Sequence, residues 1–423
     1  MLRVFECFAG YGSQSMSLKD LGIEHKVVGI SEIDPDAIIG YGAIRYKLDD
    51  IEINKDISID DMRKELISKN IGKDFKTGKS QITRMKKDKL ERLYKFNKMS
   101  NNFGDISIID PTLIPDFDYM TYSFPCTDIS IAGAQKGIIK NNTRSGLLYE
   151  CEKIIEIKKP KYLLMENVKA LLSKKFLSQF NEWCEYLENL GYTNYYKVLN
   201  AKDFGIPQNR ERVFMVSVLG DINFEFPKEH QLKKTVFDLL DEVVDKKYYI
   251  SLDKWSKHST NNVDKVTNGS IGDYRYDEGF RIRKNGLCPT LTCKTGSTSL
   301  SSNPYIFNKR IFDKYIEKTE NITNCGIGNN PCSREYSKLK ELSPTLCARD
   351  YKDPKIVKLK NQGLTIRKLT PTECLRLMGV SDDNIEKMKS IGLSESSLYK
   401  LAGNSIVKQC LDSIHKELFK DMM

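Results

Sequence analysis

Apolar and polar positions alternate between strand and helix periods along the first 220 residues. Short apolar runs typical of strands stand at Leu2 to Phe8, Val27 to Ile30, Tyr119 to Tyr122, Tyr162 to Met165 and Val213 to Val218. Helical periods separate them, the clearest being Ser13 to Leu21, with Ser13 as its expected N-cap, and Pro35 to Tyr46. Because strands that alternate with helices form βαβ units, this order predicts an α/β domain with a mostly parallel sheet.

The alternation breaks at residues 61–98, which carry 13 Lys/Arg and 5 Asp/Glu. This basic insert therefore holds +8 of the chain's formal net charge of +10. Two interpretations stay open: a solvated helical insert, or a basic surface that touches a phosphate backbone.

A second change covers residues 220–364, where Asn, Ser, Thr and Tyr rise and helical periodicity weakens. Within it, residues 281–310 hold six Lys/Arg and no acid, and the tripeptide Pro-Thr-Leu occurs at 289–291 and again at 344–346, as a repeat or by chance. Helical character returns at Pro371 to Met378 and from Asn404 onward. These changes predict three parts: a catalytic domain 1–219, an irregular second domain 220–364, and a return segment 365–423 that completes the first domain.

Composition narrows the class of protein. A chain of 423 residues with 40% hydrophobic and 29% charged residues is typical of a soluble protein of two or three domains. No apolar run has the length of a membrane span, and no signal peptide is recognisable at the N-terminus. Eleven cysteines without a CxxC pair, and four scattered histidines, argue for reduced thiols and against a zinc site. We therefore expect a cytoplasmic protein without a membrane partner or a metal, and the positive charge suits a polyanion.

Candidate chemistry begins with a glycine-containing turn, Phe8-Ala9-Gly10-Tyr11-Gly12, directly after the first strand. Glu32 ends the second strand, where an acid can bind ribose hydroxyls. The turn lacks the GxGxxG pattern that favours a dinucleotide pyrophosphate. A nucleoside ligand without a diphosphate therefore fits better, although a purely structural turn is an open alternative.

Three further features stand at strand ends, where open α/β sheets bind their ligands. Cys126 follows the strand at 118–122 in the loop Ser123-Phe124-Pro125-Cys126 and is a candidate nucleophile, although most single cysteines are structural. Glu166 ends the apolar strand at 162–165, a costly place for an acid that faces no site. Alternation points Arg210 and Arg212 to one face of the next strand, which suits an anionic ligand or a base carbonyl.

Taken in order, these segments resemble the C5-cytosine DNA methyltransferases. The other matching segments are Gly104-Asp105-Ile106, Glu166-Asn167-Val168, Gln208 to Arg212, Leu369 to Gly379 and Gly403-Asn404-Ser405. The resemblance covers residues 1–218 and 364–415 and leaves the family's variable target-recognition region between them. Tyr122 to Cys126 and Thr143 to Leu148 look most similar to the mollicute enzymes that methylate CG.

The resemblance implies a Rossmann-like S-adenosylmethionine-dependent methyltransferase sheet with a second, smaller, irregular target-recognition domain. It also implies that a cytosine flips out of duplex DNA and that Cys126 attacks its C6. Glu166 would contact N3 of the base, Arg212 would hold O2, and Arg210 would support the loop.

The methyl donor implied by the resemblance is S-adenosylmethionine, with its ribose on Glu32 and its adenine near Asp105. The residues expected to line its pocket are Phe8, Ala9, Gly10, Tyr11, Gly12, Glu32, Ile33, Asp105, Ile106, Pro125, Leu147 and Asn404. Double-stranded DNA is the expected partner of a monomeric enzyme. A restriction-modification system with a cognate endonuclease, a phage and an orphan role all remain open.

Two positions depart from the family's pattern: Thr127 stands where Gln is usual, and Ala132 stands where many members have Ser. Features of the sequence argue against three other functions. The long central region argues against a tRNA cytosine methyltransferase. The intact set of Cys126, Glu166, Arg210 and Arg212 argues against a DNA-binding regulator without activity. The missing third glycine argues against a nicotinamide-dependent dehydrogenase.

Overall fold

The chain divides into two units, each described by itself. The computed structural model describes residues 1–47, 57–75, 77–126, 128–129, 137, 144–220, 222–248, 270–275, 279–283, 287–292, 295, 303–308, 326–328, 356–358 and 365–423. Unit 1 comprises Met1–Val243, Gly286–Pro304 and Leu369–Met423, and unit 2 comprises Val244–Asn285 and Tyr305–Lys368.

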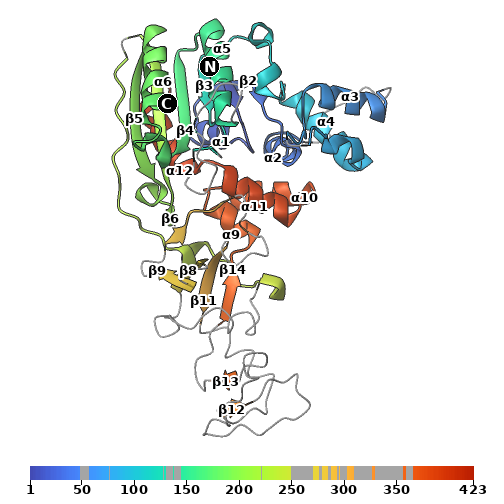
Figure 1. Ribbon diagram of the computed structural model, residues 1–423, viewed down its shortest axis with the longest axis vertical. Coiled ribbons are helices and arrows are strands. Elements are labelled where there is room, and N and C mark those ends of the chain that lie inside the picture. The colour runs from blue at the N-terminus through green and yellow to red at the C-terminus, as the bar shows by residue number, and fades with distance from the viewer. Residues whose placement is uncertain are drawn as a thin grey trace. The chain divides into compact units, whose positions relative to one another are not determined.

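A six-stranded sheet in the order β2-β1-β3-β4-β7-β5 forms the centre of unit 1 (Figure 1). Its strands are β1 (Leu2–Cys7), β2 (His25–Ser31), β3 (Tyr119–Tyr122), β4 (Tyr162–Val168), β5 (Tyr192–Asn200) and β7 (Glu211–Leu219). The first four strands pair in parallel, whereas β7 is antiparallel to both β4 and β5. The predicted α/β class is confirmed. The sheet is mixed, and its strand β5 was missing from the prediction.

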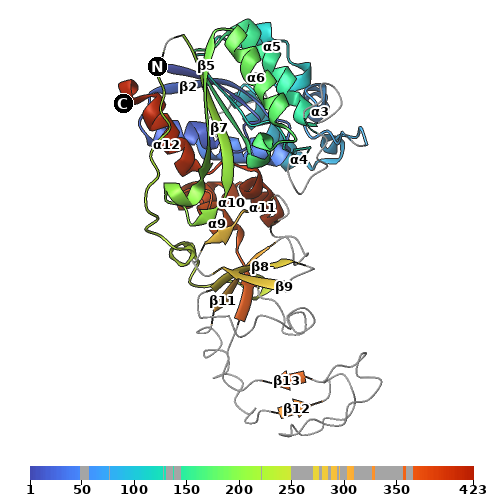
Figure 2. The same cartoon turned by 60° about the vertical axis from the view of Figure 1, so that its left-hand side comes forward.

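Helices cover both faces of this sheet (Figure 2). Helices α5 (Leu148–Lys158) and α6 (Leu177–Asn189) lie on one face, and α1 (Ser13–Asp20) and α12 (Lys408–Leu418) lie on the other. Alternation along β1 sends Phe5 and Cys7 into the apolar core beneath α5 and α6. Glu6 points to the opposite face, where it bonds to Ser15 of α1.

The basic insert forms helices that pack against the sheet domain. They are α3 (Ile59–Ser68) and α4 (Lys87–Met99), and α4 packs against α2 (Pro35–Arg45). A Cβ on Gly42 of α2 would lie 2.1 Å from the ring of Phe96 on α4, so only glycine permits this close approach. Leu90 and Leu93 of α4 are also buried. The insert is therefore helical, with an apolar stripe inside and its charges outside.

The last part of unit 1 is helical, as the return segment predicted, but its helix boundaries differ. Its helices are α9 (Pro371–Arg376), α10 (Asp382–Ser390), α11 (Glu395–Asn404) and α12. Asn404 ends α11 and does not begin a helix. At α1 the predicted Ser13 cap is wrong, because Gly12 occupies the N-cap position without a side-chain bond.

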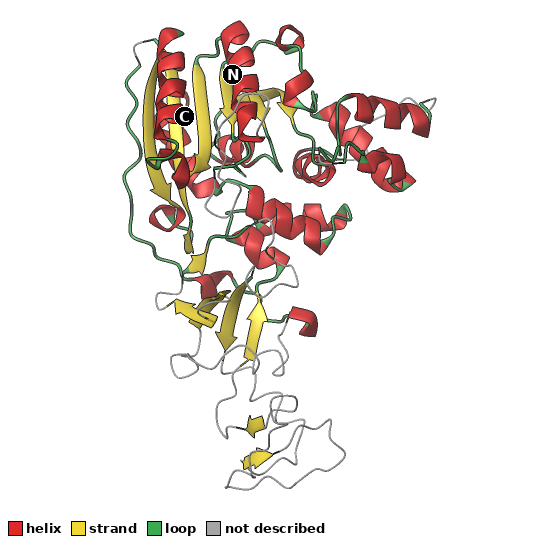
Figure 3. Cartoon of the chain, in the orientation of Figure 1, coloured by secondary structure: helices red, strands yellow, loops and turns green. Residues whose placement is uncertain are grey.

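The remaining elements are short. In unit 1, β6 (Gln208–Asn209) pairs with β10 (Cys288–Pro289). Unit 2 contains a sheet in the order β14-β11-β8-β9 and a two-stranded ladder of β12 and β13 (Figure 3). Their bounds are β8 (Ser270–Arg275), β9 (Gly279–Arg283), β11 (Pro304–Asn308), β12 (Gly326–Gly328), β13 (Ile356–Lys358) and β14 (Thr365–Lys368). The 3₁₀ helices are η2 (Gln81–Arg84), η3 (Ile106–Ile108), η4 (Pro111–Leu113), η5 (Arg144–Leu147), η6 (Lys169–Leu172), η7 (Ala201–Phe204), η8 (Val236–Leu239), η9 (Lys246–Tyr248) and η12 (Lys420–Met422).

The two units differ in extent from the predicted domains. Residues 220–243 and 286–304, predicted within the second domain, belong to unit 1. The second Pro-Thr-Leu tripeptide, at 344–346, lies outside the described residues, so the repeat stays a prediction. In the described part of the chain, no helix combines the length and apolar character that crossing a membrane requires.

A buried histidine joins three elements of unit 1. His415 of α12 contacts the Ser17 hydroxyl of α1 through Nδ1 at 2.8 Å, and the Tyr119 hydroxyl of β3 through Nε2 at 2.8 Å. Burial lowers the pKa of His415 to about 3. The ring is therefore neutral in the folded protein, whereas it is protonated below about pH 6.5 in the unfolded chain.

This histidine predicts a pH-dependent stability. Because the unfolded state binds the extra proton, the free energy of unfolding should fall as pH drops below about 6.5, by up to ~1.4 kcal/mol per pH unit. Urea unfolding at pH 5, 6 and 7 measures this slope. His415→Gln should reduce it, whereas the same substitution at exposed His230 should keep it. Equal slopes in the wild type and His415→Gln would contradict the assignment.

Candidate active site

Arg45 of α2 stabilises the glycine turn between β1 and α1 by hydrogen bonds to its backbone carbonyls. Its Nη1 donates to the Tyr11 carbonyl at 3.0 Å and its Nη2 to the Gly12 carbonyl at 2.6 Å. Gly12 is left-handed, with φ of 79°, and a Cβ there would lie 2.1 Å from Arg45 Nη2. The turn therefore requires glycine at this position both for its backbone conformation and for the close approach of the guanidinium.

A buried acid completes this support. The Glu6 carboxylate accepts the Ser15 N–H at 2.9 Å and the Tyr41 hydroxyl at 2.7 Å. The Arg45 guanidinium lies over the Tyr41 ring, 3.7 Å from its centroid, and bonds to the Ser15 hydroxyl. Glu6 and Arg45 thus both contact Ser15 and Tyr41. The sequence did not predict either role, because the bond from Tyr41 to Glu6 and the bonds from Arg45 to the turn join residues more than 30 positions apart.

Glu32 connects the turn to the end of β2. Its Oε2 accepts the Gly10 N–H at 2.8 Å, and its Oε1 accepts the N–H groups of Ile33 and Asp34, each at 2.8 Å. Burial raises the pKa of Glu32, and these three N–H groups oppose the rise. Among the described residues other than its chain neighbours, the atom nearest to the Cβ position of Gly10 is the Ser405 hydroxyl oxygen at 3.9 Å. The turn therefore leaves room for a ligand to approach its backbone.

Asn102 brings the acidic segment to the same place. Its Oδ1 accepts the Glu32 N–H and the Gly104 N–H, each at 3.0 Å. Asp105, which follows, caps η3 through the Ser107 N–H at 3.0 Å and accepts the Asn70 amide at 2.8 Å. The structure therefore joins the predicted pocket residues of the turn, the β2 end and the 104–106 segment through one hydrogen-bonded chain.

The predicted Pro-Cys loop is anchored on both sides of Pro125. The Asn167 amide donates to the Phe124 carbonyl at 3.1 Å, and the Ser145 hydroxyl donates to the Pro125 carbonyl at 2.7 Å. Ser145 lies in η5, so Leu147, which ends η5, stands two residues from this anchor. Thr127 and Ala132 lie outside the described residues.

Glu166 and Arg212 meet because β4 and β7 run antiparallel. Val168 pairs with Arg212, and Glu166 pairs with Phe214, so Glu166 and Arg212 are diagonal neighbours on one face. The Arg212 Nε lies 3.1 Å from the Glu166 Oε1, and both side chains are largely buried. The pairing that the sequence left unspecified thus creates a buried ion pair at the end of β4.

The electrostatics of Cys126 follow from this pair. Burial raises the pKa of the Cys126 thiol, the Glu166 carboxylate adds to the rise, and Arg212 and Arg210 oppose it. Burial also raises the pKa of Glu166, against the same two guanidiniums. The Cys126 thiol, the Glu166 carboxyl group and the two guanidiniums are therefore electrostatically coupled.

Arg210 is buried and contacts backbone carbonyls. Its Nη1 donates to the Leu291 carbonyl at 3.0 Å, and its Nη2 donates to the carbonyls of Ser405 at 2.7 Å and Gly403 at 3.3 Å. Burial, with Arg212 nearby, lowers the pKa of Arg210 to about 9, so the group remains charged at neutral pH. These bonds hold the segment that contains Asn404, an exposed residue beside buried Ser405.

A family model described as C-5 cytosine-specific DNA methylase matches residues 60–420. The chain belongs to this family. It is 42% identical to the type II methyltransferase M2.ScrFI of Lactococcus lactis subsp. cremoris, over 99% of each chain. It is 36% identical to the orphan methyltransferase M.SssI of Spiroplasma monobiae, over 71% of this chain and 81% of that one. The predicted family resemblance and enzyme class are confirmed.

Solved structures show the same fold. The Dnmt2 methyltransferase of S. pombe matches with a TM-score of 0.57 and 17% identity, over 100% of this chain and 99% of that one. The methyltransferase EhMeth of Entamoeba histolytica matches with the same score, identity and coverage. The predicted methyltransferase fold is thereby confirmed. In the described part of the chain, no group of His, Cys, Asp or Glu side chains could hold a metal ion.

The charge next to Cys126 predicts how its thiol titrates. Glu166→Gln removes the carboxylate that opposes the thiolate and leaves the two guanidiniums that favour it. The pH midpoint of Cys126 alkylation by iodoacetamide should therefore move to lower pH. Mass spectrometry of the Cys126 peptide measures this midpoint apart from the other cysteines, with Cys126→Ser as the blank. A midpoint that stays in place or rises would contradict this reading of the site.

Proposed function

We propose that the enzyme methylates C5 of a cytosine flipped out of duplex DNA, through a covalent adduct with Cys126. The observation that carries the proposal is the Glu166–Arg212 ion pair at 3.1 Å, both members of which act electrostatically on the Cys126 thiol. The Cys126 thiolate forms a bond to C6, and the N3 side of the ring takes a proton or hydrogen bond from Glu166. This makes C5 nucleophilic. After C5 has taken the methyl group, the C5 proton passes to solvent, any proton on N3 returns to Glu166, and the bond from C6 to the Cys126 sulfur breaks, which restores the aromatic ring and the thiolate.

Each residue has a role that its environment supports. A carboxyl group with a raised pKa is suited to proton donation near neutral pH, as we propose for Glu166. Arg212, held at 3.1 Å from Glu166, would donate to O2 of the base. The Nη1 and Nη2 groups of Arg210 donate to backbone carbonyls, so we propose Arg210 as a positioning residue.

We propose that S-adenosylmethionine binds at the glycine turn and supplies an electrophilic methyl group when bound. The Glu32 Oε2 accepts only one of the three N–H bonds, so it keeps a lone pair with which it can accept a ribose hydroxyl. Asp105 stands on the same hydrogen-bonded chain and would face the adenine. The residues proposed to line the rest of the pocket are Phe8, Ala9, Tyr11, Ile33, Ile106, Pro125, Leu147 and Asn404.

For the partner, we propose double-stranded DNA read by the central region 220–364. Its basic segment 281–310 would neutralise phosphates and offset the few kcal/mol that base flipping costs. Relatives named as type II and as orphan enzymes support either a restriction-modification system with a cognate endonuclease or a solitary role. A monomer in the cytoplasm is part of the same proposal.

The direct test is Cys126→Ser. Methyl transfer from tritiated S-adenosylmethionine to duplex DNA should fall to background, while cofactor affinity stays within a few-fold because the turn is unchanged. Cys184→Ser, at another partly buried cysteine, should keep wild-type turnover. Retention of more than a few per cent of turnover in Cys126→Ser would refute the nucleophile. Transfer to tRNA instead of DNA by the wild type would favour the RNA alternative.

A further inference from the structure

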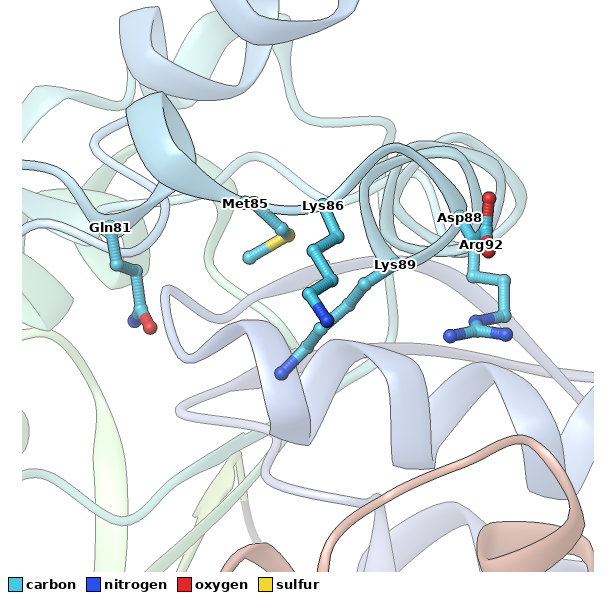
Figure 4. Close-up of a pocket in the computed structure, with 6 residues that line it drawn as sticks. All are labelled: Gln81, Met85, Lys86, Asp88, Lys89 and Arg92. Carbon is cyan, nitrogen blue, oxygen red and sulfur yellow. The ribbon is translucent and has the colours of Figure 1, made fainter.

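A cationic hollow lies in the basic insert, apart from the residues of the proposed active site. It has a volume of about 370 Å³ and is lined by Gln81, Met85, Lys86, Asp88, Lys89 and Arg92 (Figure 4). Three of the six lining side chains are cations and one is an acid. The Asp88 carboxylate points away from the ends of Lys86 and Lys89 (Figure 4). The charge at the ammonium side of the hollow is therefore positive.

Within the described residues, two of the three cations form no ion pair. Lys89 is paired with Asp36 at 2.6 Å. Lys86 and Arg92 form no ion pair with any residue that the structure describes. Because the Arg92 Nε is buried, the terminal Nη groups of Arg92 are the ones available to a ligand.

Some cations of the insert stand beside acids: Lys98 is 2.6 Å from Glu65, and Lys64 is 3.3 Å from Asp61. What distinguishes Lys86 and Arg92 is that these two cations, which form no ion pair among the described residues, line the same hollow. The hollow is also built on fixed elements. Buried Met85 and Ile82 anchor the segment before α4, and buried Leu90 and Leu93 anchor the first two turns of α4. The positions of Lys86 and Arg92 are thus set by packing against the domain.

We propose that this hollow binds a phosphate group. Lys86 supplies a compact positive charge, Arg92 supplies the Nη groups of its guanidinium, and the Gln81 amide supplies a further donor. Such a set matches the several acceptor oxygens of a phosphate. The group is either a phosphodiester of DNA or a free phosphate, and the proposal goes beyond the methyl-transfer chemistry. It selects the phosphate-binding interpretation of the insert and assigns it to these residues.

The test compares two variants with the same loss of charge. The first variant combines Lys86→Gln with Arg92→Gln and so removes both cations of the hollow that form no ion pair. Lys64→Gln with Lys87→Gln removes two charges from the same insert at side chains that do not line it. Fluorescence anisotropy then measures the affinity for a labelled duplex from 50 to 200 mM salt. A phosphodiester in the hollow predicts an affinity about tenfold weaker for the first variant and a salt slope shallower by about 0.9. The second variant should change the slope less.

Titration calorimetry with inorganic phosphate distinguishes the second source. A free phosphate predicts that the wild type and the control bind the ion, that the hollow variant does not, and that the DNA salt slopes agree. Since Arg92 is partly buried, Lys86→Gln alone, at an exposed side chain, repeats both arms without risk to the fold. Equal DNA slopes together with no phosphate binding by the wild type would overturn the proposal. Both arms measure binding, so their outcome is independent of the Cys126 chemistry.

Discussion

The arrangement of the active site depends on one buried guanidinium. Arg210 donates to the carbonyls of Leu291, Gly403 and Ser405, three groups far from it in the sequence. Gln208, two residues earlier, donates to the Leu377 carbonyl at 2.8 Å and so adds a fourth connection. Without these donors, buried carbonyls would lose their partners, at about 1–3 kcal/mol each. The segment before β7 is thereby joined to the C-terminal helices, and β7 carries Arg212 to the site.

Antiparallel pairing of β4 with β7 then brings the charged groups of the site together. It places Arg212 diagonally across from Glu166, and Asn167 next to Glu166 holds the Phe124 carbonyl of the Cys126 loop. Burial raises the pKa values of Cys126 and Glu166, whereas the two guanidiniums limit both shifts. The same low-dielectric setting thus favours the neutral form of Glu166 and makes the thiolate of Cys126 dependent on its cationic neighbours.

The sequence predicted the parts that depend on local pattern. The predicted strand ends indicated the glycine turn, Glu32, Cys126 and Glu166 as site candidates, because open α/β sheets bind their ligands at the carboxyl ends of the strands. The role of Arg45 stayed hidden, because its bonds to the Tyr11 and Gly12 carbonyls span more than 30 residues. Strand β5 was missed because exposed and buried positions mix along it. The Ser13 cap failed because the left-handed Gly12 already starts the helix.

The most direct test of the account is a covalent trap. A duplex with 5-fluorocytosine at the target position takes the methyl group and the Cys126 thiolate, but fluorine cannot leave C5 as a proton does. With S-adenosylmethionine present, the proposed mechanism predicts a stable complex of protein and DNA. Mass spectrometry of the digested complex should then identify the peptide that contains Cys126 as the modified one. Methylation of the unmodified duplex at the same position, without any adduct on the fluorinated one, would contradict it.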